Sequence, residues 1–328
     1  MTEVTLPRLG MGTAAIGNLY HAVTDEAARE TVTSAVAAGI AYFDTAPHYG
    51  FGLAERRLGD TLAEVDPQGA AIISTKVGRR LVPTDATGER HGFVDADPFE
   101  PLFDYSADGV LRSHEASLAR LRRDRVDILL AHDLGRLTHG DDHPAQLRAF
   151  LDGGYGAMRA LRDAGAVDAI GIGVNEVAIC EELLARVELD IVLLAGRHTL
   201  LDPDSATALF AKCAERGVRV IIGGPYNSGI LARGGIATAT GLHYDYRPPD
   251  PDILARALRI EAICADFGVP LPAAALQFPL RHPQVAAVIP GMVGADQVTA
   301  SVARLATAIP DALWAALDEM MHDEEKPQ

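Results

Sequence analysis

Polar residues of three types stand where apolar, β-like runs of the sequence end. Asp44 and Lys76 each close such a run, His132 follows a third, and Tyr49 comes five residues after the aspartate. Taken singly, each has a structural explanation, as a helix cap, a solvated strand end or a satisfied core histidine. Their recurrence on consecutive runs favours a shared site.

These residue types can move a proton at a hydroxyl or carbonyl group. The pKa of an unperturbed tyrosine is about 10, and a lysine cation beside Tyr49 should favour the phenolate and lower that pKa. Asp44 would keep Lys76 charged and oriented, while His132 would hydrogen-bond the reacting oxygen. Tyr49 would take a proton from a hydroxyl as hydride leaves the same carbon, or give one to a carbonyl in reverse. The hydride requires a cofactor, since no side chain accepts it.

Eight β-like runs, each followed by room for a helix, would position these residues. The runs are continuously apolar, which fits strands buried on both faces. Eight strand–helix units make a closed α/β barrel, the (β/α)8 TIM barrel, whereas an open doubly wound sheet lacks its glycine fingerprint here. We therefore expect one barrel domain over residues 1–328. The expected strands cover residues 7–13, 40–44, 70–76, 126–131, 169–174, 191–194, 218–222 and 285–289.

Three connections are longer than plain loops between a strand and a helix. They cover residues 78–108, 133–155 and 232–251. All three leave the carboxyl ends of expected strands, the face on which barrel enzymes place their active sites. Loops of this length are usually lids or binding loops, so we expect them to wall a substrate pocket.

Charge and cysteine content exclude several classes of function. The formal net charge of −16 argues against a nucleic-acid surface, which needs clustered cations. The three cysteines match no metal or redox spacing and suit a reducing compartment. The first residues have neither the basic nor the apolar region typical of a signal peptide, and no apolar run reaches about 20 residues. We expect a cytoplasmic protein that binds neither nucleic acid nor a membrane, as a monomer or a weak homodimer.

The motif Phe43-Asp-Thr-Ala-x-x-Tyr49-Gly50, followed by Lys76 and His132, resembles the signature of the aldo-keto reductase superfamily. The resemblance covers almost the whole chain. Segments 104–113, 193–202 and 223–231 resemble the bacterial branch of L-fucose and D-threo-aldose 1-dehydrogenases, with pyridoxal 4-dehydrogenase nearby. The resemblance implies a nicotinamide-dependent oxidoreductase whose catalytic residues are Asp44, Tyr49, Lys76 and His132.

The same resemblance implies a cofactor site. Asn175 should hold the nicotinamide carboxamide, and the turn 224–229 should pass under the pyrophosphate, with Asn227 and Ser228 donating. Taken alone, that glycine cluster would equally be a tight turn. The implied cofactor-binding residues are Thr13, Asn175, Gly224, Pro225, Asn227, Ser228, Gly229, Pro290, Gly291 and Gln297.

The segment near the adenosine ribose predicts NAD rather than NADP. Relatives that prefer NADP usually carry cations there, but this chain has Gly291, Met292 and Gln297, with no Lys or Arg until Arg304. A 2′-phosphate without a cationic partner would be poorly compensated.

Three positions depart from the family pattern. Ala195 stands where many members have a glutamine that binds the carboxamide, and Gly223 where an aromatic often stacks on the nicotinamide. His198 replaces a common tyrosine, and is either a contact of substrate or cofactor or an ordinary surface histidine.

The resemblance and the NAD prediction together favour oxidation. A cyclic hemiacetal bears a hydrogen and a hydroxyl on one carbon, so removing a hydride and a proton gives a lactone. L-Fucose, D-arabinose and L-galactose fit, as does pyridoxal, which would give 4-pyridoxolactone; a general aldehyde or ketone reductase is a further alternative. Candidate substrate-binding residues are His48, Phe51, Asp133, Arg197, His198 and Tyr226.

Two other classes of function compete with this interpretation. One is a metal-dependent barrel hydrolase with His48, His132, Asp133 and His198 as ligands, although Lys76 and Tyr49 would then have no role. The favoured interpretation includes no metal. The other is a barrel that binds a nicotinamide as a redox-sensing subunit and turns over slowly, which the complete set of four residues argues against.

Overall fold

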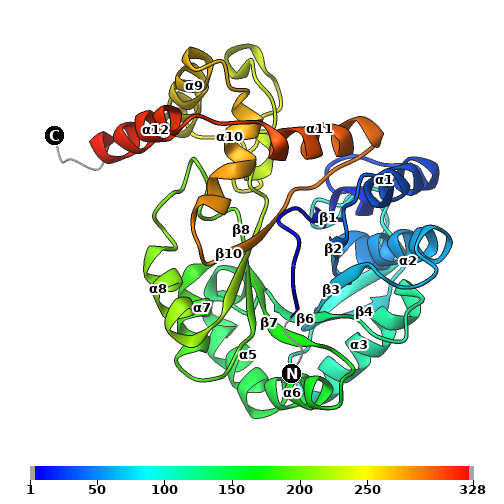
Figure 1. The fold of residues 1–328 in the computed structure, drawn as a ribbon. Helices are drawn as coiled ribbons and strands as arrows, with labels where there is room; N and C mark the ends of the chain where they lie inside the picture. Colours follow the sequence, from blue (N-terminus) through cyan, green and yellow to red (C-terminus); the bar gives the residue numbers. More distant parts are fainter. Residues whose placement is uncertain (1–3, 325–328) are drawn as a thin grey trace.

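The computed structural model describes residues 4–324 and shows eight parallel strands with helices around them (Figure 1). In order around the sheet, the strands are β1 (Met11–Gly12), β2 (Tyr42–Asp44), β3 (Ile72–Val77), β6 (Ile128–His132), β7 (Ala169–Val174), β8 (Ile191–Ala195), β9 (Arg219–Gly223) and β10 (Val285–Ile289). The last strand returns to the first through parallel bridges between Leu9 and Val288 and between Gly12 and Gly291. The expected TIM barrel is confirmed, and every expected strand overlaps an observed one.

Helices form the outer layer of the barrel (Figure 1). The first begins after Thr24, whose side chain accepts a hydrogen bond from the amide of Ala27, and is followed by Gly39 at a φ of +84°. The helices are α1 (Asp25–Ala37), α2 (Leu53–Val65), α3 (Ala107–Leu121), α4 (Arg136–His139), α5 (His143–Ala149), α6 (Tyr155–Asp163), α7 (Val177–Leu184), α8 (Thr207–Arg216), α9 (Pro251–Asp266), α10 (Leu271–Gln277), α11 (Ala295–Ala306) and α12 (Asp311–Glu324).

Alternation along the strands separates two cores and sets the direction of the site residues. In β6, Ile128 and Leu130 pack inside the barrel, whereas Leu129 and Ala131 pack among the strands and helices outside it. Since successive side chains of a strand point to opposite faces, His132 shares the inward direction of Leu130. Asp44 points inward like Tyr42, which is two residues before it. Lys76 points inward like Ile72, which is four residues before it.

The long connections contain secondary structure that the sequence analysis does not anticipate. Residues 78–108 include an antiparallel hairpin of β4 (Arg79–Pro83) and β5 (Phe99–Phe103). Residues 133–155 are largely helical, with α4 and α5 running through a π-helical turn at Phe150–Gly154 into α6. The connection 232–251 keeps an irregular course apart from a 3-10 turn at Ile236–Thr238. The hairpin is the element that matters most for the site.

Within residues 4–324, no single helix is long and apolar enough to cross a membrane. One pair of helices, Pro251–Asp266 and Leu271–Arg281, passes a test of length and composition when taken together, with a bend of 104° between them. Many residues of this pair, among them Ile260 and Leu276, are buried in the core.

Candidate active site

The inward direction shared by Asp44, Lys76 and His132 brings them together at the carboxyl rim of the barrel. Neighbouring strands hold them in register, with Asp44 opposite Ser74 and Lys76 opposite Leu130. The sequence expectation that these three residues share one rim is therefore met by the geometry.

Tyr49 reaches the same rim from a tight turn after β2. The turn Tyr49–Gly52 contains left-handed backbone at Gly50 and Phe51, with φ of +62° and +56°. A Cβ atom on Gly50 would lie 2.4 Å from the carbonyl oxygen of Gly17. Only glycine fits this approach, so Gly50 fixes the turn that presents the phenol.

Lys76 is the centre of a buried hydrogen-bond network. Its side chain is 1% exposed, and Nζ donates to Asp44 Oδ2 at 2.7 Å and to the carbonyl oxygen of Thr45 at 2.8 Å. The third donor reaches Tyr49 Oη at 3.2 Å. An ammonium group has three donors, so Lys76 is fully engaged, and one of its bonds ends on the phenol oxygen.

A second layer of polar groups holds Asp44 in place. Ser74 Oγ donates to Asp44 Oδ1 at 2.7 Å and lies 2.9 Å from the hydroxyl of Tyr42. Thr13 Oγ1 donates to the carbonyl oxygen of Asp44 at 2.9 Å. The sequence analysis placed Thr13 with the cofactor and did not identify Ser74. Ser74 is two residues before Lys76 on one strand, which would have predicted that both side chains share the inward face.

The proton affinity of Tyr49 differs from the sequence expectation. Burial raises the pKa of Tyr49 well above 10, and the negative charge of Asp44 raises it further, while Arg79 lowers it. The expected lowering of the pKa is wrong for this structure, because the desolvation of the phenolate outweighs the nearby cations. Tyr49 is a neutral phenol whose oxygen accepts from Lys76, which leaves its own proton free to point into the cavity.

His132 is a neutral imidazole facing the same space. Burial lowers its pKa well below 6.5, with Arg79, Lys76 and His48 contributing in the same direction. Its ring centroid lies 5.9 Å from that of Tyr49, edge to face. Nδ1 is buried and finds no hydrogen-bond partner among the described residues. A neutral imidazole carries one donor and one acceptor, so His132 can hydrogen-bond an oxygen brought to Tyr49.

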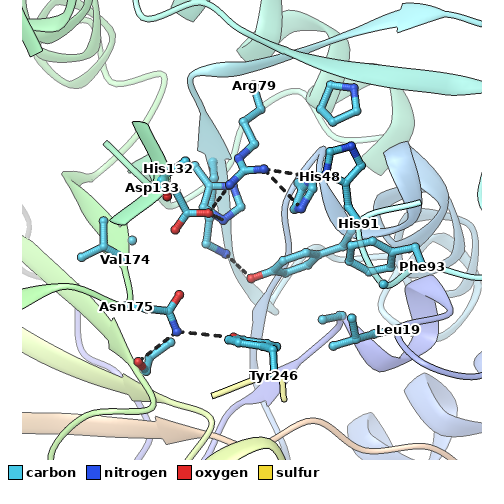
Figure 2. Close-up of a pocket in the computed structure, with 18 of the residues that line it drawn as sticks. Leu19, His48, Arg79, His91, Phe93, His132, Asp133, Val174, Asn175 and Tyr246 are labelled. Atoms are coloured by element: carbon cyan, nitrogen blue, oxygen red, sulfur yellow. Dashed lines mark hydrogen bonds and ion pairs between the residues drawn. The ribbon is translucent and has the colours of Figure 1, made fainter. Parts of the chain in front are cut away.

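Figure 2 shows the cavity onto which these groups open, with Arg79, His48 and Asp133 grouped on one side and Asn175 and Tyr246 on another. Its volume is about 660 Å³, which suits a small molecule together with part of a cofactor. Polar and aromatic side chains share the wall. Beyond the residues already named, it is lined by Leu19, Tyr20, His91, Phe93, Pro101, Phe103, Thr138, Val174, Leu193 and Ala195, among others.

Arg79 is the main residue of the cavity wall that the sequence analysis missed. It is the first residue of β4, it is 8% exposed, and its guanidinium forms an ion pair with Asp133. Nη1 lies 3.3 Å from the ring of His48, whose pKa is lowered well below 6.5 by burial first and by Arg79 second. The sequence does show an arginine three residues after Lys76. The direction of the Arg79 side chain, however, is set by the hairpin, which the sequence analysis did not expect.

The expected substrate residues divide into two groups. His48 and Asp133 line the cavity, and Arg197 lines an adjoining pocket, where it pairs with Asp245 at 2.9 Å. Three others do not line either space, which corrects the sequence expectation. They are Phe51, buried beneath His48; His198, packed on Phe210 with Nδ1 2.8 Å from the carbonyl oxygen of Pro203; and Tyr226, whose hydroxyl accepts from Arg304.

The side of the cavity opposite the hairpin fits a nicotinamide carboxamide. Asn175 Nδ2 donates to the carbonyl oxygen of Ala195 at 3.1 Å and, more weakly, to the hydroxyl of Tyr246 at 3.4 Å. The side chain of Asn175 thus lines the wall, and its amide can exchange the weak bond to Tyr246 for one to a ligand. The wall carries only small side chains at Ala195 and Gly223. A Cβ atom on Gly223 would lie 3.2 Å from the Cβ atom of Ala195, which leaves little room for a larger residue.

The glycine-rich turn 224–229 has the irregular backbone of an anion site, but its polar side chains hydrogen-bond to other residues of the protein. Gly224 and Gly229 have φ of +56° and +103°, and Asn227 and Ser228 are also left-handed. Asn227 Nδ2 donates to the carbonyl oxygen of Gly196 at 3.1 Å, and Ser228 Oγ accepts from the amide of Tyr246 at 3.0 Å. Backbone amides of Gly224 and its neighbours, rather than these side chains, are the groups that suit phosphates. Pro225 lies buried in the same turn.

The segment expected at the adenosine ribose follows β10 on the same rim. Gly12 donates its amide to the carbonyl oxygen of Pro290 at 3.0 Å, and Gln297 Oε1 accepts from the amide of Val293 at 3.1 Å. Gly291 and Gln297 are exposed. Arg304 lies further along α11, where its guanidinium donates to Tyr226 and to the carbonyl oxygen of Ala232, both at 3.2 Å.

The four ligands of the hydrolase alternative do not converge. His198 packs against Phe210 and His282, outside the cavity that His48, His132 and Asp133 line. Across residues 4–324, no group of three or more His, Cys, Asp and Glu side chains could hold a metal ion.

Comparison with known sequences places the chain in one family. A model of the aldo/keto reductase family matches residues 8–322. Pyridoxal 4-dehydrogenase of Microbacterium luteolum is 40% identical, over 96% of this chain and 94% of that protein. D-threo-aldose 1-dehydrogenase of a Pseudomonas species is 36% identical over the same shares of the two chains, 96% and 94%. L-galactose dehydrogenase of Arabidopsis thaliana is 28% identical, over 92% and 85%.

Solved structures agree on the fold. An aldo-keto reductase of Bacillus halodurans in its holo form superposes with a TM-score of 0.71 at 24% identity, covering 96% of this chain and 92% of that one. A glycerol dehydrogenase of Gluconobacter oxydans gives a TM-score of 0.75 at 21% identity, over 100% and 95%. The chain belongs to the aldo/keto reductase family and is an oxidoreductase that uses a nicotinamide cofactor.

Proposed function

We propose that this protein oxidises the hemiacetal carbon of a cyclic aldose to a lactone, with Tyr49 as the general acid and base. The observation that carries the proposal is the contact between Lys76 and Tyr49 at the cavity. The 3.2 Å hydrogen bond fixes the phenol oxygen beside neutral His132, where a substrate hydroxyl can reach both. A bound nicotinamide supplies the hydride acceptor.

Each residue has a role in this reaction that follows from its contacts. His132 hydrogen-bonds the oxygen of the substrate and holds it near Tyr49. Tyr49 takes the hydroxyl proton as the carbon loses its hydride, so the carbon–oxygen single bond becomes the lactone carbonyl. Lys76 stabilises the phenolate that precedes this transfer, and Asp44 holds Lys76 in position. Asn175 positions the carboxamide of the cofactor.

A sugar fits the composition of the cavity. Hydrogen-bonding groups from Arg79, Asp133 and Thr138 line the same space as aromatic rings such as Phe93. Sugars need several directed hydrogen bonds together with an apolar platform. Names of two relatives, an aldose 1-dehydrogenase and an L-galactose dehydrogenase, support aldoses as the substrate class. L-Fucose, D-arabinose and L-galactose are the proposed candidates.

NAD is the proposed cofactor. The residues from Pro290 to Ala303 include no Lys or Arg, and Arg304 already donates to Tyr226 and Ala232. A 2′-phosphate placed near Gly291 and Gln297 would lack a charged partner. The ratio of kcat/KM for NAD and NADP tests this directly, and a preference for NADP would overturn it.

The test of the proposed function is the formation of reduced cofactor, followed by its absorbance. The panel holds L-fucose, D-arabinose, L-galactose and pyridoxal, each with NAD and with NADP, and the product is assayed as a lactone. Turnover of an aldose with lactone formation supports the proposal. Failure of all three sugars would overturn it, and silence across the whole panel with cofactor still bound would leave another carbonyl substrate or the redox-sensing alternative.

Pyridoxal is a second candidate substrate, and a specific observation favours it. A relative named pyridoxal 4-dehydrogenase is 40% identical over nearly the whole of both chains. Pyridoxal also closes to a hemiacetal, and its flat ring would lie against Phe93 and its neighbours. Activity with pyridoxal alone would keep every role of Tyr49, Lys76 and His132 and change only the substrate. A general aldehyde or ketone reductase would instead consume NADH with simple aldehydes and form no lactone.

A further inference from the structure

A second ion pair, between buried Arg79 and partly buried Asp133, faces the cavity beside the Asp44–Lys76 pair. The guanidinium of Arg79 pairs with Asp133, lies 3.3 Å from the ring of His48 and stacks over Phe103 at 4.9 Å. Arg79 Nε is buried without a hydrogen-bond partner in the part of the chain that the structure describes. Neither residue of this pair hydrogen-bonds Tyr49 or Lys76, although Asp133 Oδ2 lies 3.5 Å from Nε2 of His132.

The backbone is built to hold both members of the pair. Gly78 turns the chain from β3 into β4 at a φ of +102°, and a Cβ there would lie 2.2 Å from the ring of Tyr105. Asp133 itself is left-handed, with a φ of +48°, and its amide donates to the carbonyl oxygen of Gly173 at 3.0 Å. Such backbone is costly for a residue other than glycine and persists where the surroundings impose it, often at functional sites.

The pair leaves the cavity without net charge. Two cations reach it, Lys76 and Arg79, and each has its own carboxylate, Asp44 and Asp133. His48 and His132 are neutral, since burial lowers the pKa of each well below 6.5. His91, at the rim, has Glu100 as its partner at 2.7 Å.

Asp133 lies directly beside the reacting groups, with Oδ2 3.5 Å from Nε2 of His132, and Arg79 lies about one ring further away. The ring of His48, which Arg79 contacts, has its centroid 5.9 Å from that of His132, and His132 is 5.9 Å from Tyr49. A sugar whose reacting carbon lies between Tyr49 and His132 would therefore lie against Asp133 and Arg79 (Figure 2).

We infer that the Arg79–Asp133 pair sets the charge specificity of the substrate pocket, admitting uncharged substrates and rejecting those that carry a carboxylate. This inference rests on the proposed function for the identity of the substrate. A buried guanidinium binds carboxylates through short, paired hydrogen bonds, and Asp133 already accepts from Nη2 of Arg79. An anionic substrate would have to lie beside the Asp133 carboxylate in a desolvated site, a built-in repulsion that excludes the wrong ligand.

Three sugars with the same ring test this inference. L-Fucose and L-galactose are uncharged, and L-galacturonate carries a carboxylate at the sixth carbon. The Asp133→Asn variant should free the guanidinium of Arg79 and raise kcat/KM for L-galacturonate relative to L-fucose by about tenfold or more. The Arg79→Met variant should move that ratio in the opposite direction, because Asp133 then lacks its counter-charge.

The matched control is Asp168→Asn, which removes the same charge from the Arg125–Asp168 pair outside the cavity. Its ratio should equal that of the unaltered protein. An equal change for all three sugars in Asp133→Asn would overturn the inference, as would a gain for L-galacturonate in Arg79→Met. Arg79→Met decides the question if Asp133→Asn does not fold.

Calorimetric titration of the NADH-loaded protein, which cannot oxidise the sugar, with L-galacturonate separates this inference from the proposed function. Asp133→Asn should bind L-galacturonate at least about tenfold more tightly than the unaltered protein, whether or not any sugar is oxidised. Tighter binding without sugar turnover would retain the inference and overturn the proposed function. Sugar turnover without tighter binding would do the reverse.

Discussion

Two sides of the same cavity differ in how firmly their polar groups are held. On the side of β2 and β3, Asp44 and Lys76 are 2% and 1% exposed, and every donor of Lys76 is used. On the side of β7 and β9, Tyr246 is 56% exposed, and the amide of Asn175 is shared between two acceptors, one of them at 3.4 Å. The polar groups of the first side are fully hydrogen-bonded to one another, and those of the second can change partners. We call them the rigid side and the adjustable side of the cavity.

The difference follows from where the residues lie in the fold. Asp44 and Lys76 are the inward ends of adjacent barrel strands, so the hydrogen bonds of the sheet fix their backbones. Tyr246 lies in the irregular connection 232–251, where its amide donates to Ser228 and its hydroxyl accepts the weak bond from Asn175. Chemistry that depends on position to within a fraction of an ångström belongs on the rigid side, and a ligand that must enter and leave belongs on the other.

The largest expected effect comes from removing one oxygen on the rigid side. Tyr49→Phe should lower kcat by a factor of about 10² to 10⁴, the contribution of a positioned acid or base, while the dissociation constant of the cofactor stays unchanged. Steady-state kinetics and a fluorescence titration with NADH measure the two quantities. Tyr155→Phe removes a hydroxyl far from the cavity and is the matched control. Activity within a few fold of the unaltered protein would refute the role of Tyr49.

Breaking the buried pair should cost stability as well as activity. Lys76→Met leaves the carboxylate of Asp44 buried without its cation, which should lower the free energy of unfolding by about 3 to 5 kcal/mol. Chemical denaturation measures this change. Adding Asp44→Asn to the same chain should restore part of the stability but none of the activity, because the uncompensated charge is then gone. An unchanged stability in Lys76→Met would show that the network is less desolvated than its burial indicates.

The pH dependence should report the raised pKa of Tyr49. Oxidation needs the phenolate to accept a proton, and burial holds the pKa of Tyr49 well above 10. The phenolate fraction then grows about tenfold per pH unit below that pKa, so kcat/KM for oxidation should rise steadily from pH 7 to pH 10. Protonation of His132, whose pKa lies well below 6.5, should cause no loss in this range. A plateau near pH 7 would mean that the cations control Tyr49 after all.

The strands explain why so much of the rigid side could be predicted from the sequence. Alternation along an apolar run states which side chains share a face, so the ends of three runs were enough to bring Asp44, Lys76 and His132 together. The pKa of Tyr49 was not predictable in this way. A nearby lysine can be counted in the sequence, but the burial that outweighs it depends on the packed structure.

The remaining residues of the cavity come from segments without a simple period. Arg79 reaches Asp133 because residues 79–83 pair with 99–103, and nothing in the composition of 78–108 indicated this hairpin. Tyr246 depends on the left-handed backbone at Asp245 and Tyr246. Tyr226 was expected at the substrate and lies against Arg304 instead, because side-chain direction in the tight turn after β9 does not follow the alternation of the strand.

The smallest expected effect lies on the adjustable side, at the hydroxyl of Tyr246. That hydroxyl accepts a hydrogen bond from Asn175 at 3.4 Å, a length at the weak end of the range. Tyr246→Phe removes a competitor for the amide, so the dissociation constant for NAD should fall by about twofold, corresponding to less than about 0.5 kcal/mol. Fluorescence titration measures it, and kcat with any substrate should stay the same. A weaker affinity would mean that the hydroxyl itself contacts the cofactor, and a loss of kcat would mean that Tyr246 belongs to the rigid side and that the division between the two sides is wrong.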